Sequence, residues 1–278
     1  MKCEVTVLEF RKNMVVKGYS KRTVGNYISI IERFIDFLQK DLKDVTIEDI
    51  KRFFLYLRDD NCSESTIRTY LSILKTFLLF IEGEDVANEI ILPKVEKKLP
   101  IVLTVEEIRK LLENIENIRD LVVVRLLYAS GLRVSELVNL DRESIEGNKI
   151  IVRSGKGKKD RIVLIDDGTS KLLKRYLEKR KDKDKALFVS NRGERLGTRS
   201  IQNLVKKYAE KTGIKKNVTP HTLRHTFATH LLQNKANIMV IKDLLGHENI
   251  STTQIYTHVT DAHREETYED AHPLSISG

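Results

Sequence analysis

Two stretches in the N-terminal third repeat each other at an offset of 43 residues, and this repeat constrains the fold more than any other feature. The first set is Ser20, Thr23, Tyr27, Ser29, Phe34 and Phe37, and the second is Ser63, Thr66, Tyr70, Ser72, Phe77 and Phe80. Each leading serine suits a helix cap, and each apolar set lies on one helix face. The pattern predicts either two core helices of a common type or a duplicated helical hairpin.

A boundary region follows at residues 83–103, where Pro93 and Pro100 flank a lysine-rich stretch. A chain of 278 residues has the length of two ordinary domains. We therefore expect a helical domain over residues 1–92, a linker over 93–103 and a larger domain over 104–278, with a C-terminal tail from about residue 260.

The larger domain is also predicted to be mostly helical. Residues 118–129 are apolar nearly all round, which is typical of a buried central helix. Residues 149–153 and 161–165 are rich in β-branched side chains and flank Gly155, Lys156 and Gly157, which predicts a β-hairpin with Lys156 near its turn. Residues 186–189 are expected to add a short third strand. The fold class is therefore mainly α with a small β-sheet.

Positive charge is concentrated in one part of the chain. The formal net charge is +9, and residues 149–185 alone carry 14 basic and 6 acidic groups, whereas residues 261–278 carry one basic and five acidic groups. A lysine-rich run is often only a solvated face, but a patch that contains a glycine turn favours contact with phosphates. Nucleic acid is the favoured partner, and the polar first turns of a duplicated hairpin would suit its backbone.

Composition excludes several classes of protein. Hydrophobic residues make up 41% of the chain and charged residues 32%, which is too apolar for a disordered polyelectrolyte. No apolar run approaches the roughly 18 residues that a bilayer span needs, and the N-terminus has no signal-peptide pattern. Two cysteines, Cys3 and Cys62, cannot form a disulfide scaffold and lack metal-site spacing. We expect a reduced, cytoplasmic protein without a membrane segment.

Reactive side chains are predicted at two helix ends. Gly131 suits the end of the buried helix, and Arg133 and Glu136 follow it three residues apart, so that Glu136 can orient Arg133. Thr219 and Pro220 are a strong helix opening. His221 and Arg224 then lie in the first turns of one helix, where exposed N–H groups favour an anion.

Two more reactive positions come near the C-terminus. Gly246 is a helix stop that leaves His247 just beyond it, and Ser251 with Gln254 opens a short helix carrying Tyr256. Each feature also has an ordinary structural explanation: an ion pair, a structural histidine or a packed tyrosine. A metal site among His221, His225 and His230 is disfavoured, because no cysteine or carboxylate cluster accompanies them.

One chemistry accounts for the whole set, namely a metal-free attack on a phosphodiester. Arg133 and Arg224 would stabilise the phosphate, because arginine keeps its proton. A tyrosine is only ~0.1% phenolate at pH 7, a deficit of roughly 4 kcal/mol, which His221 or the two nearby guanidinium charges would offset. Lys156 would protonate the departing sugar oxygen, and Tyr256 would hold the DNA covalently.

These residues stand in motifs that resemble the tyrosine recombinases of the phage integrase family, most closely the Xer type, including archaeal ones. The resemblance covers nearly the whole chain. The five matching segments, in chain order, are LLYASGLRVSEL (126–137), GKGKKDR (155–161), HTLRH (221–225), LLGH (244–247) and STTQIY (251–256). The resemblance implies an active site of Arg133, Lys156, His221, Arg224, His247 and Tyr256, with Tyr256 as nucleophile, His247 on the phosphate and Glu136 in support. It implies no cofactor and no metal.

The resemblance also implies an architecture and a set of partners. A SAM-like helical DNA-binding domain and an α+β catalytic domain would close around duplex DNA, and a homotetramer would exchange strands through a Holliday junction. The tail from Thr260 would dock on a neighbouring protomer. Resolution of chromosome or plasmid dimers, with a translocase or accessory protein, is the expected role. The alternatives are DNA relaxation as by a type IB topoisomerase, and a non-catalytic DNA-binding regulator.

Overall fold

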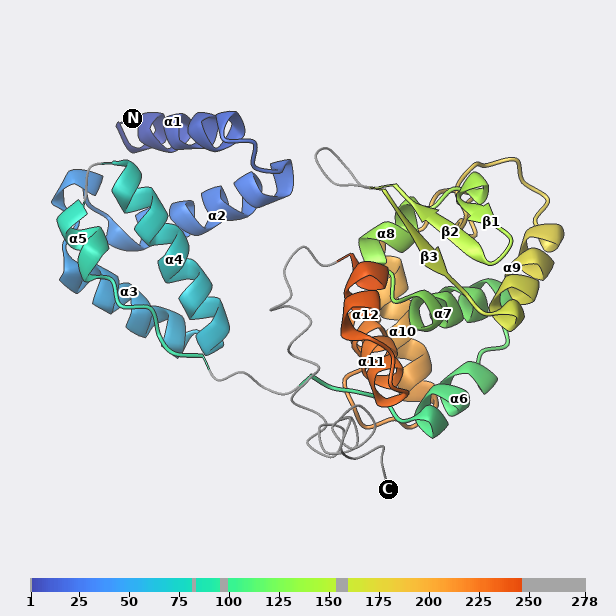
Figure 1. The fold of residues 1–278 in the computed structure, drawn as a ribbon. Coiled ribbons are helices and arrows are strands. Elements are labelled where there is room, and N and C mark those ends of the chain that lie inside the picture. The colour runs from blue at the N-terminus through green and yellow to red at the C-terminus, as the bar shows by residue number, and fades with distance from the viewer. Residues whose placement is uncertain (1, 82–83, 96–99, 154–159, 247–278) are drawn as a thin grey trace, which may run out of the picture. The chain divides into compact units, whose positions relative to one another are not determined.

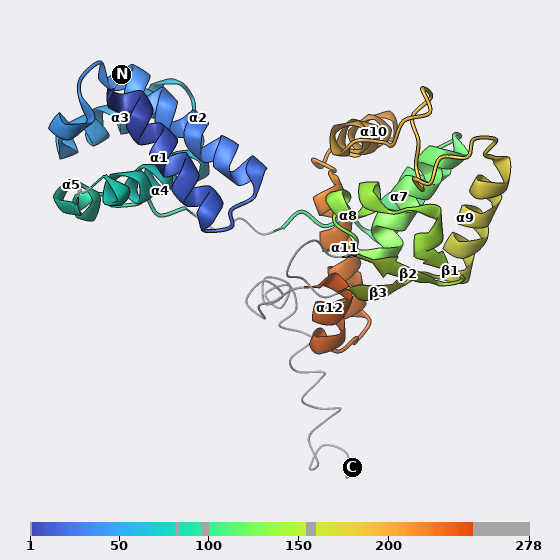
Figure 2. The same cartoon turned by 90° about the horizontal axis from the view of Figure 1, so that it is seen from above.

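The computed structural model describes residues 2–81, 84–95, 100–153 and 160–246 of the chain (Figures 1 and 2). The chain divides into two compact units, Met1–Lys98 and Leu99–Gly278. Each unit encloses its own cluster of buried apolar side chains. Within the described residues, no helix combines the length and the apolar content that crossing a membrane requires.

The described part of the first unit consists of helices and the loops that connect them. Its elements are α1 (Lys2–Val16), α2 (Lys21–Leu38), the 3-10 turn η1 (Leu42–Asp44), α3 (Ile47–Asp59), α4 (Glu64–Phe80) and α5 (Glu84–Glu89). Helix α2 packs against α1, α3 and α4. Two of the repeated phenylalanines lie in this core: Phe34 meets Phe53 edge to face at 5.0 Å between ring centroids, and Phe77 meets Phe10 at 5.2 Å.

The two repeated segments form helices α2 and α4, which begin with the same turn. The hydroxyl of Ser20 accepts a hydrogen bond from the backbone N–H of Thr23 at 3.1 Å, and Ser63 accepts one from Thr66 at 3.2 Å. Both predicted serine caps are therefore confirmed. The capped turns are exposed, so each helix presents a pair of hydroxyl groups at its start.

Part of the predicted boundary region belongs to the first unit. Residues 84–89 form α5, and Ala87 and Ile90 are buried in the core of that unit. The guanidinium of Arg68 on α4 also donates a hydrogen bond to the carbonyl oxygen of Pro93 at 2.6 Å. Residues 84–92 therefore pack with the first unit, because their apolar side chains complete its core.

The second unit is built around one buried helix, as predicted. Its helices are α6 (Val105–Glu113), α7 (Ile118–Ser130), α8 (Val134–Asn139), α9 (Asp167–Lys179), α10 (Thr198–Lys211), α11 (Pro220–Gln233) and α12 (Ile238–Leu245), with a 3-10 turn η2 (Arg142–Ser144). Helix α7 contacts α9, α10, α11 and the sheet (Figure 1). Side chains on several faces of this helix are buried, and Val122, Val123 and Leu126 are examples.

A three-stranded antiparallel sheet in the order β1-β2-β3 lies beside α7. Strands β2 (Lys149–Val152) and β3 (Arg161–Leu164) pair with Val152 opposite Arg161, which confirms the predicted hairpin. Its turn, with Lys156, lies outside the described residues. The third strand is β1 (Ile145–Glu146), not residues 186–189. That prediction was wrong, because the carbonyls of Ala186 and Leu187 are satisfied by the guanidinium of Arg180.

Candidate active site

The first part of the site follows the tight turn at the C-terminus of α7. Gly131 has a φ of +61°, and a Cβ atom at this position would lie 2.5 Å from the ring of Phe227 and 2.9 Å from Leu245. Only glycine fits here, because both the backbone conformation and the close packing exclude a side chain. The tight turn makes Arg133 the N-cap residue of α8.

Glu136 fixes Arg133 from the first turn of α8. One carboxylate oxygen accepts from the backbone N–H of Arg133 at 2.8 Å, and the other accepts from its guanidinium at 3.0 Å. The carboxylate therefore holds the arginine at both its backbone and its side chain. The predicted pairing of the two residues is confirmed.

Arg161, the first residue of β3, binds the same carboxylate. Its two terminal nitrogens donate to the two oxygens of Glu136 at 2.9 and 2.8 Å. Burial by itself raises the pKa of Glu136, but the hydrogen bonds from Arg161 and Arg133 outweigh it and bring the pKa down to about 2. Glu136 is thus ionised at neutral pH and lies between two guanidinium groups.

Arg224 enters from α11, whose start is capped as predicted. The hydroxyl of Thr219 accepts from the backbone N–H of Thr222 at 3.1 Å, and Pro220 occupies the first position. The side chain of Arg224 points inward, and the residue is only 2% exposed. Its guanidinium donates to the carbonyl oxygens of Gly131 at 2.5 Å and Leu245 at 2.7 Å.

The two predicted catalytic arginines converge on the end of α12. Arg133 donates to the carbonyl oxygen of Leu245 at 3.4 Å and to that of Gly246 at 3.3 Å. Because Arg224 donates to Leu245 as well, two guanidinium groups from different helices share one oxygen atom. The arrangement places two fixed positive charges around one point, which suits an anion with several oxygens.

His221 lies beside these cations on the first turn of α11. Burial, and then the positive charges of Arg224 and Arg133, lower the pKa of His221 below its ordinary value. Its Nε2 atom lies 2.8 Å from Nε2 of His225, so one ring donates and the other accepts. Burial and the neighbouring His221 and Arg224 lower the pKa of His225 to about 4. Both rings are therefore neutral at pH 7.

The third histidine of this helix faces a different neighbour. Nδ1 of His230 lies 2.9 Å from the hydroxyl of Tyr128 on α7.

The structure brings together Arg133, Glu136, His221 and Arg224 from the predicted site. Lys156, His247 and Tyr256 lie outside the described residues, as do Ser251 and Gln254.

Arg161 was not among the predicted site residues. In the sequence, Arg161 is the last residue of the GKGKKDR segment. The charge count includes it only as one of the basic residues of that region. A buried bidentate pair with Glu136 depends on tertiary structure, and sequence spacing alone does not reveal it.

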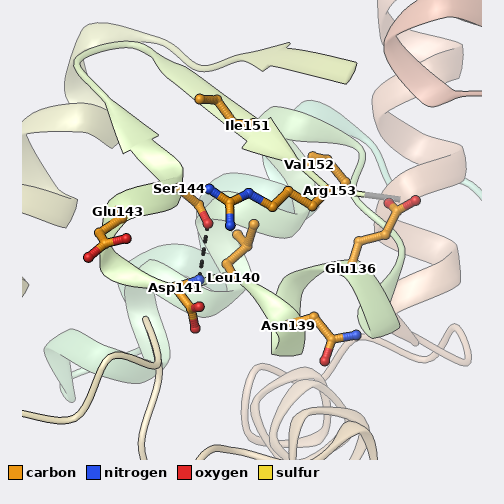
Figure 3. Close-up of a pocket in the computed structure, with 9 residues that line it drawn as sticks. All are labelled: Glu136, Asn139, Leu140, Asp141, Glu143, Ser144, Ile151, Val152 and Arg153. Atoms are coloured by element: carbon orange, nitrogen blue, oxygen red, sulfur yellow. Dashed lines mark hydrogen bonds between the residues drawn. The ribbon is translucent and has the colours of Figure 1, made fainter. Parts of the chain in front are cut away.

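A small cavity lies behind Glu136, between α8, η2 and β2 (Figure 3). Its lining includes Asp141, Ser144 and Arg153, and the carboxylate of Glu136 points away from the first two of these (Figure 3). Its volume of about 50 Å³ accommodates a few water molecules, well short of the roughly 300 Å³ at which small-molecule sites begin. The cavity is therefore too small for a nucleotide or another small-molecule ligand.

A helical unit followed by a mixed unit in which two arginines and a histidine converge is the arrangement expected of a tyrosine recombinase. The chain belongs to the phage integrase family: the model of that family matches residues 102–263, and the model of a phage integrase N-terminal SAM-like domain matches residues 7–87. The fold class and the family expected from the sequence motifs are both confirmed.

Similar proteins within the family are of the Xer type. The chain is 40% identical to tyrosine recombinase XerA of Pyrococcus horikoshii over 95% of this chain and 92% of that protein. It is 36% identical to tyrosine recombinase XerD of Oceanobacillus iheyensis over 93% of this chain and 95% of that protein. The chain is thus a Xer-type tyrosine recombinase by similarity to both archaeal and bacterial relatives.

Solved structures agree with this placement. A crystal structure of XerA recombinase matches with a TM-score of 0.58 and 32% identity, over 96% of this chain and 98% of that one. A structure of XerH site-specific recombinase bound to palindromic difH substrate in a post-cleavage complex matches with a TM-score of 0.74 and 25% identity, over 89% of this chain and 79% of that one.

Proposed function

We propose that this chain is a site-specific DNA recombinase that cleaves and rejoins duplex DNA through a covalent 3′-phosphotyrosine intermediate. The observation that carries the proposal is the oxygen of Leu245 shared by Arg133 and Arg224. A scissile phosphate bound beside these two side chains would meet two guanidinium groups at once. The XerH relative captured with its difH substrate after cleavage supports DNA as the ligand.

The described residues supply the electrostatic part of the reaction. Attack on phosphorus moves negative charge onto the non-bridging oxygens, and fixed guanidinium groups stabilise that charge. Arginine cannot serve as a base, because it keeps its proton at any physiological pH. His221 is neutral at pH 7, since burial and the two arginines lower its pKa, and it is therefore able to accept the proton of an attacking phenol.

The remaining steps are assigned to residues of the matching motifs. Tyr256 attacks the phosphorus and becomes joined to the 3′ end, while the 5′ sugar oxygen leaves. Lys156 protonates that oxygen, which is otherwise a poor leaving group. His247 donates a hydrogen bond to the phosphate. The phosphotyrosine bond keeps the energy of the broken bond for rejoining to a different strand, and no metal or cofactor takes part.

The biological partners follow from the Xer relatives. We propose that four protomers join two duplex sites and exchange strands in two steps through a Holliday junction. Resolution of chromosome or plasmid dimers, and so chromosome partition at cell division in the cytoplasm, is the proposed role. A translocase or another accessory protein would control the reaction.

A topological assay on supercoiled plasmids separates recombination from the alternatives. The target is first located by footprinting on genomic fragments. A plasmid with two copies of that site is then compared with a plasmid that has none. We expect site-dependent recombinant products. Relaxation of both plasmids alike would indicate a topoisomerase, and specific binding without any strand breakage would indicate a regulator.

A further inference from the structure

We propose that Arg161 is a positioning residue that couples the catalytic arginine Arg133 to the base of the lysine hairpin and to the end of α12. The inference rests on the proposed function and adds a residue to it. Arg161 touches neither substrate nor reacting atoms in this account. It acts through Glu136, which in turn orients Arg133.

The contacts of Arg161 join three separate segments. It is the first residue of β3, where it pairs with Val152 of β2 across the hairpin that carries Lys156. Its terminal nitrogens bind both oxygens of Glu136 on α8 at 2.9 and 2.8 Å. Its Nε donates to the carbonyl oxygen of Leu244 on α12 at 3.2 Å. Arg161 thus belongs to the hairpin by its backbone, and its guanidinium links the hairpin to α8 and to the end of α12.

Close packing at Gly246 adds a second constraint. A Cβ atom at this position would lie 3.0 Å from Nε of Arg161, and the φ of Gly246 is +62°. The chain therefore turns directly against the guanidinium. The next residue along the chain is His247. A displaced Arg161 would release both the α12 terminus and the carboxylate that holds Arg133.

The shape of the guanidinium matters as well as its charge. Each oxygen of the Glu136 carboxylate accepts one hydrogen bond from Arg161 and one from Arg133. Lysine has one compact ammonium group and cannot bind both oxygens and the carbonyl of Leu244 in the same plane. Arg161→Lys therefore keeps the charge and removes the fork, which weakens the hold on the carboxylate that orients Arg133.

The test measures single-turnover cleavage of a nicked suicide substrate by Arg161→Lys at saturating protein, with Arg109→Lys as the control. Arg109 is an exposed arginine on α6, outside the basic segment of residues 149–185. We expect cleavage by Arg161→Lys to fall about 10- to 100-fold, since misplaced catalytic groups cost about this much. DNA affinity should change by less than about twofold, because the Arg161 side chain is only 13% exposed and paired with Glu136, and lysine keeps its charge.

Two modified substrates identify the route by which Arg161 acts. A methylphosphonate at the scissile position lacks the negative charge that Arg133 would stabilise. The loss of cleavage rate in Arg161→Lys should therefore be smaller on this substrate. A 5′-bridging phosphorothiolate has a leaving group that needs no proton, so it should not restore the rate. Rescue by the phosphorothiolate alone would mean that Arg161 serves Lys156, and an equal defect on all substrates would mean a merely structural role. Either result overturns the proposal.

A second variant keeps the test decisive if Arg161→Lys is unstable. Glu136→Gln retains the shape of the side chain and removes the charge that Arg161 binds. It should show the same substrate pattern, and the double variant should cleave no more slowly than the worse single variant. Normal cleavage by Arg161→Lys alongside active wild type would refute the role of Arg161. Absence of cleavage by wild type and by Arg109→Lys would instead refute the proposed function.

Discussion

Arg133 and Arg224 donate hydrogen bonds to the same atom, the carbonyl oxygen of Leu245, at 3.4 and 2.7 Å. One arginine caps α8 and the other lies in α11, so tertiary packing brings them together. The turn at Gly131 makes this possible, because its carbonyl oxygen also accepts from Arg224. A phosphate beside these two side chains would find both guanidinium groups already oriented.

Arg133→Ala is expected to abolish most cleavage and leave the fold intact. The side chain of Arg133 is 40% exposed, so its removal opens no large cavity in the core. Loss of one positioned donor should slow cleavage about 10²- to 10³-fold. The measurement is the single-turnover rate on a nicked substrate, with Arg109→Ala on α6 as the control. Comparable rates for the two variants would contradict the role of Arg133.

Gly131→Ala should destabilise the catalytic unit much more than Gly193→Ala. Both glycines have positive φ, at +61° and +81°, so alanine is strained at either position by about 1 kcal/mol. Only at Gly131 does the added Cβ meet side chains within 3 Å, whereas nothing lies within 4 Å at Gly193. Overpacking adds about 1–3 kcal/mol. Urea unfolding of the two variants measures the difference, and equal losses would show that the packing at Gly131 is not tight.

Stability should fall as the pH drops from 6.5 towards 4, and His225 should contribute to that fall. Burial, His221 and Arg224 lower the pKa of folded His225 to about 4, whereas an unfolded histidine titrates near 6.5. Between these values the unfolded chain binds a proton that the folded chain does not, so acid favours unfolding. His225→Gln removes this titration and still offers His221 a hydrogen bond.

The measurement is the free energy of unfolding at a series of pH values for wild type and His225→Gln. The free energy of unfolding of wild type, relative to that of His225→Gln, should fall by about 3 kcal/mol between pH 7 and 4. Other groups, Glu136 among them, titrate equally in both proteins and cancel in the difference. Parallel curves over this range would show that His225 is protonated at its ordinary pKa in the folded chain.

Lys156→Ala should slow cleavage by impeding departure of the 5′ oxygen. A 5′-bridging phosphorothiolate needs no proton on its leaving group, so it should restore the rate of this variant. The comparison isolates proton transfer, because both substrates carry the same charge on the non-bridging oxygens. Failure of the sulfur substrate to rescue the variant would remove Lys156 from the general-acid role.

Local signals predicted the helix starts and stops well. The serine, threonine and glycine caps at Ser20, Ser63, Thr219 and Gly131 all form, because capping depends on a few neighbouring residues. The hairpin of β2 and β3 was also predictable, because β-branched runs flank a glycine turn. Family motifs then identified the arginines and His221 that the structure brings together.

Features that depend on distant partners escaped prediction. Residues 186–189 look like a strand because they are apolar and buried, but an apolar run alone does not distinguish a strand from an irregular buried segment. Arg180 satisfies the carbonyl groups of Ala186 and Leu187, and the segment makes only isolated bridges, from Ala186 to Asp141 and from Val189 to Arg195. The pair of Arg161 and Glu136 likewise joins β3 to α8, and its two residues carry no mutual signal in the sequence.

Identification of the residue bonded to DNA tests the central claim most directly. A nicked suicide substrate is incubated with the protein in the presence of a chelator, and the trapped adduct is digested and sequenced by mass spectrometry. We predict a 3′-phosphate joined to Tyr256, formed without added metal, and no adduct with Tyr256→Phe, which should still bind DNA. An adduct on another residue, a trapped Tyr256→Phe complex or a strict need for magnesium would contradict the account.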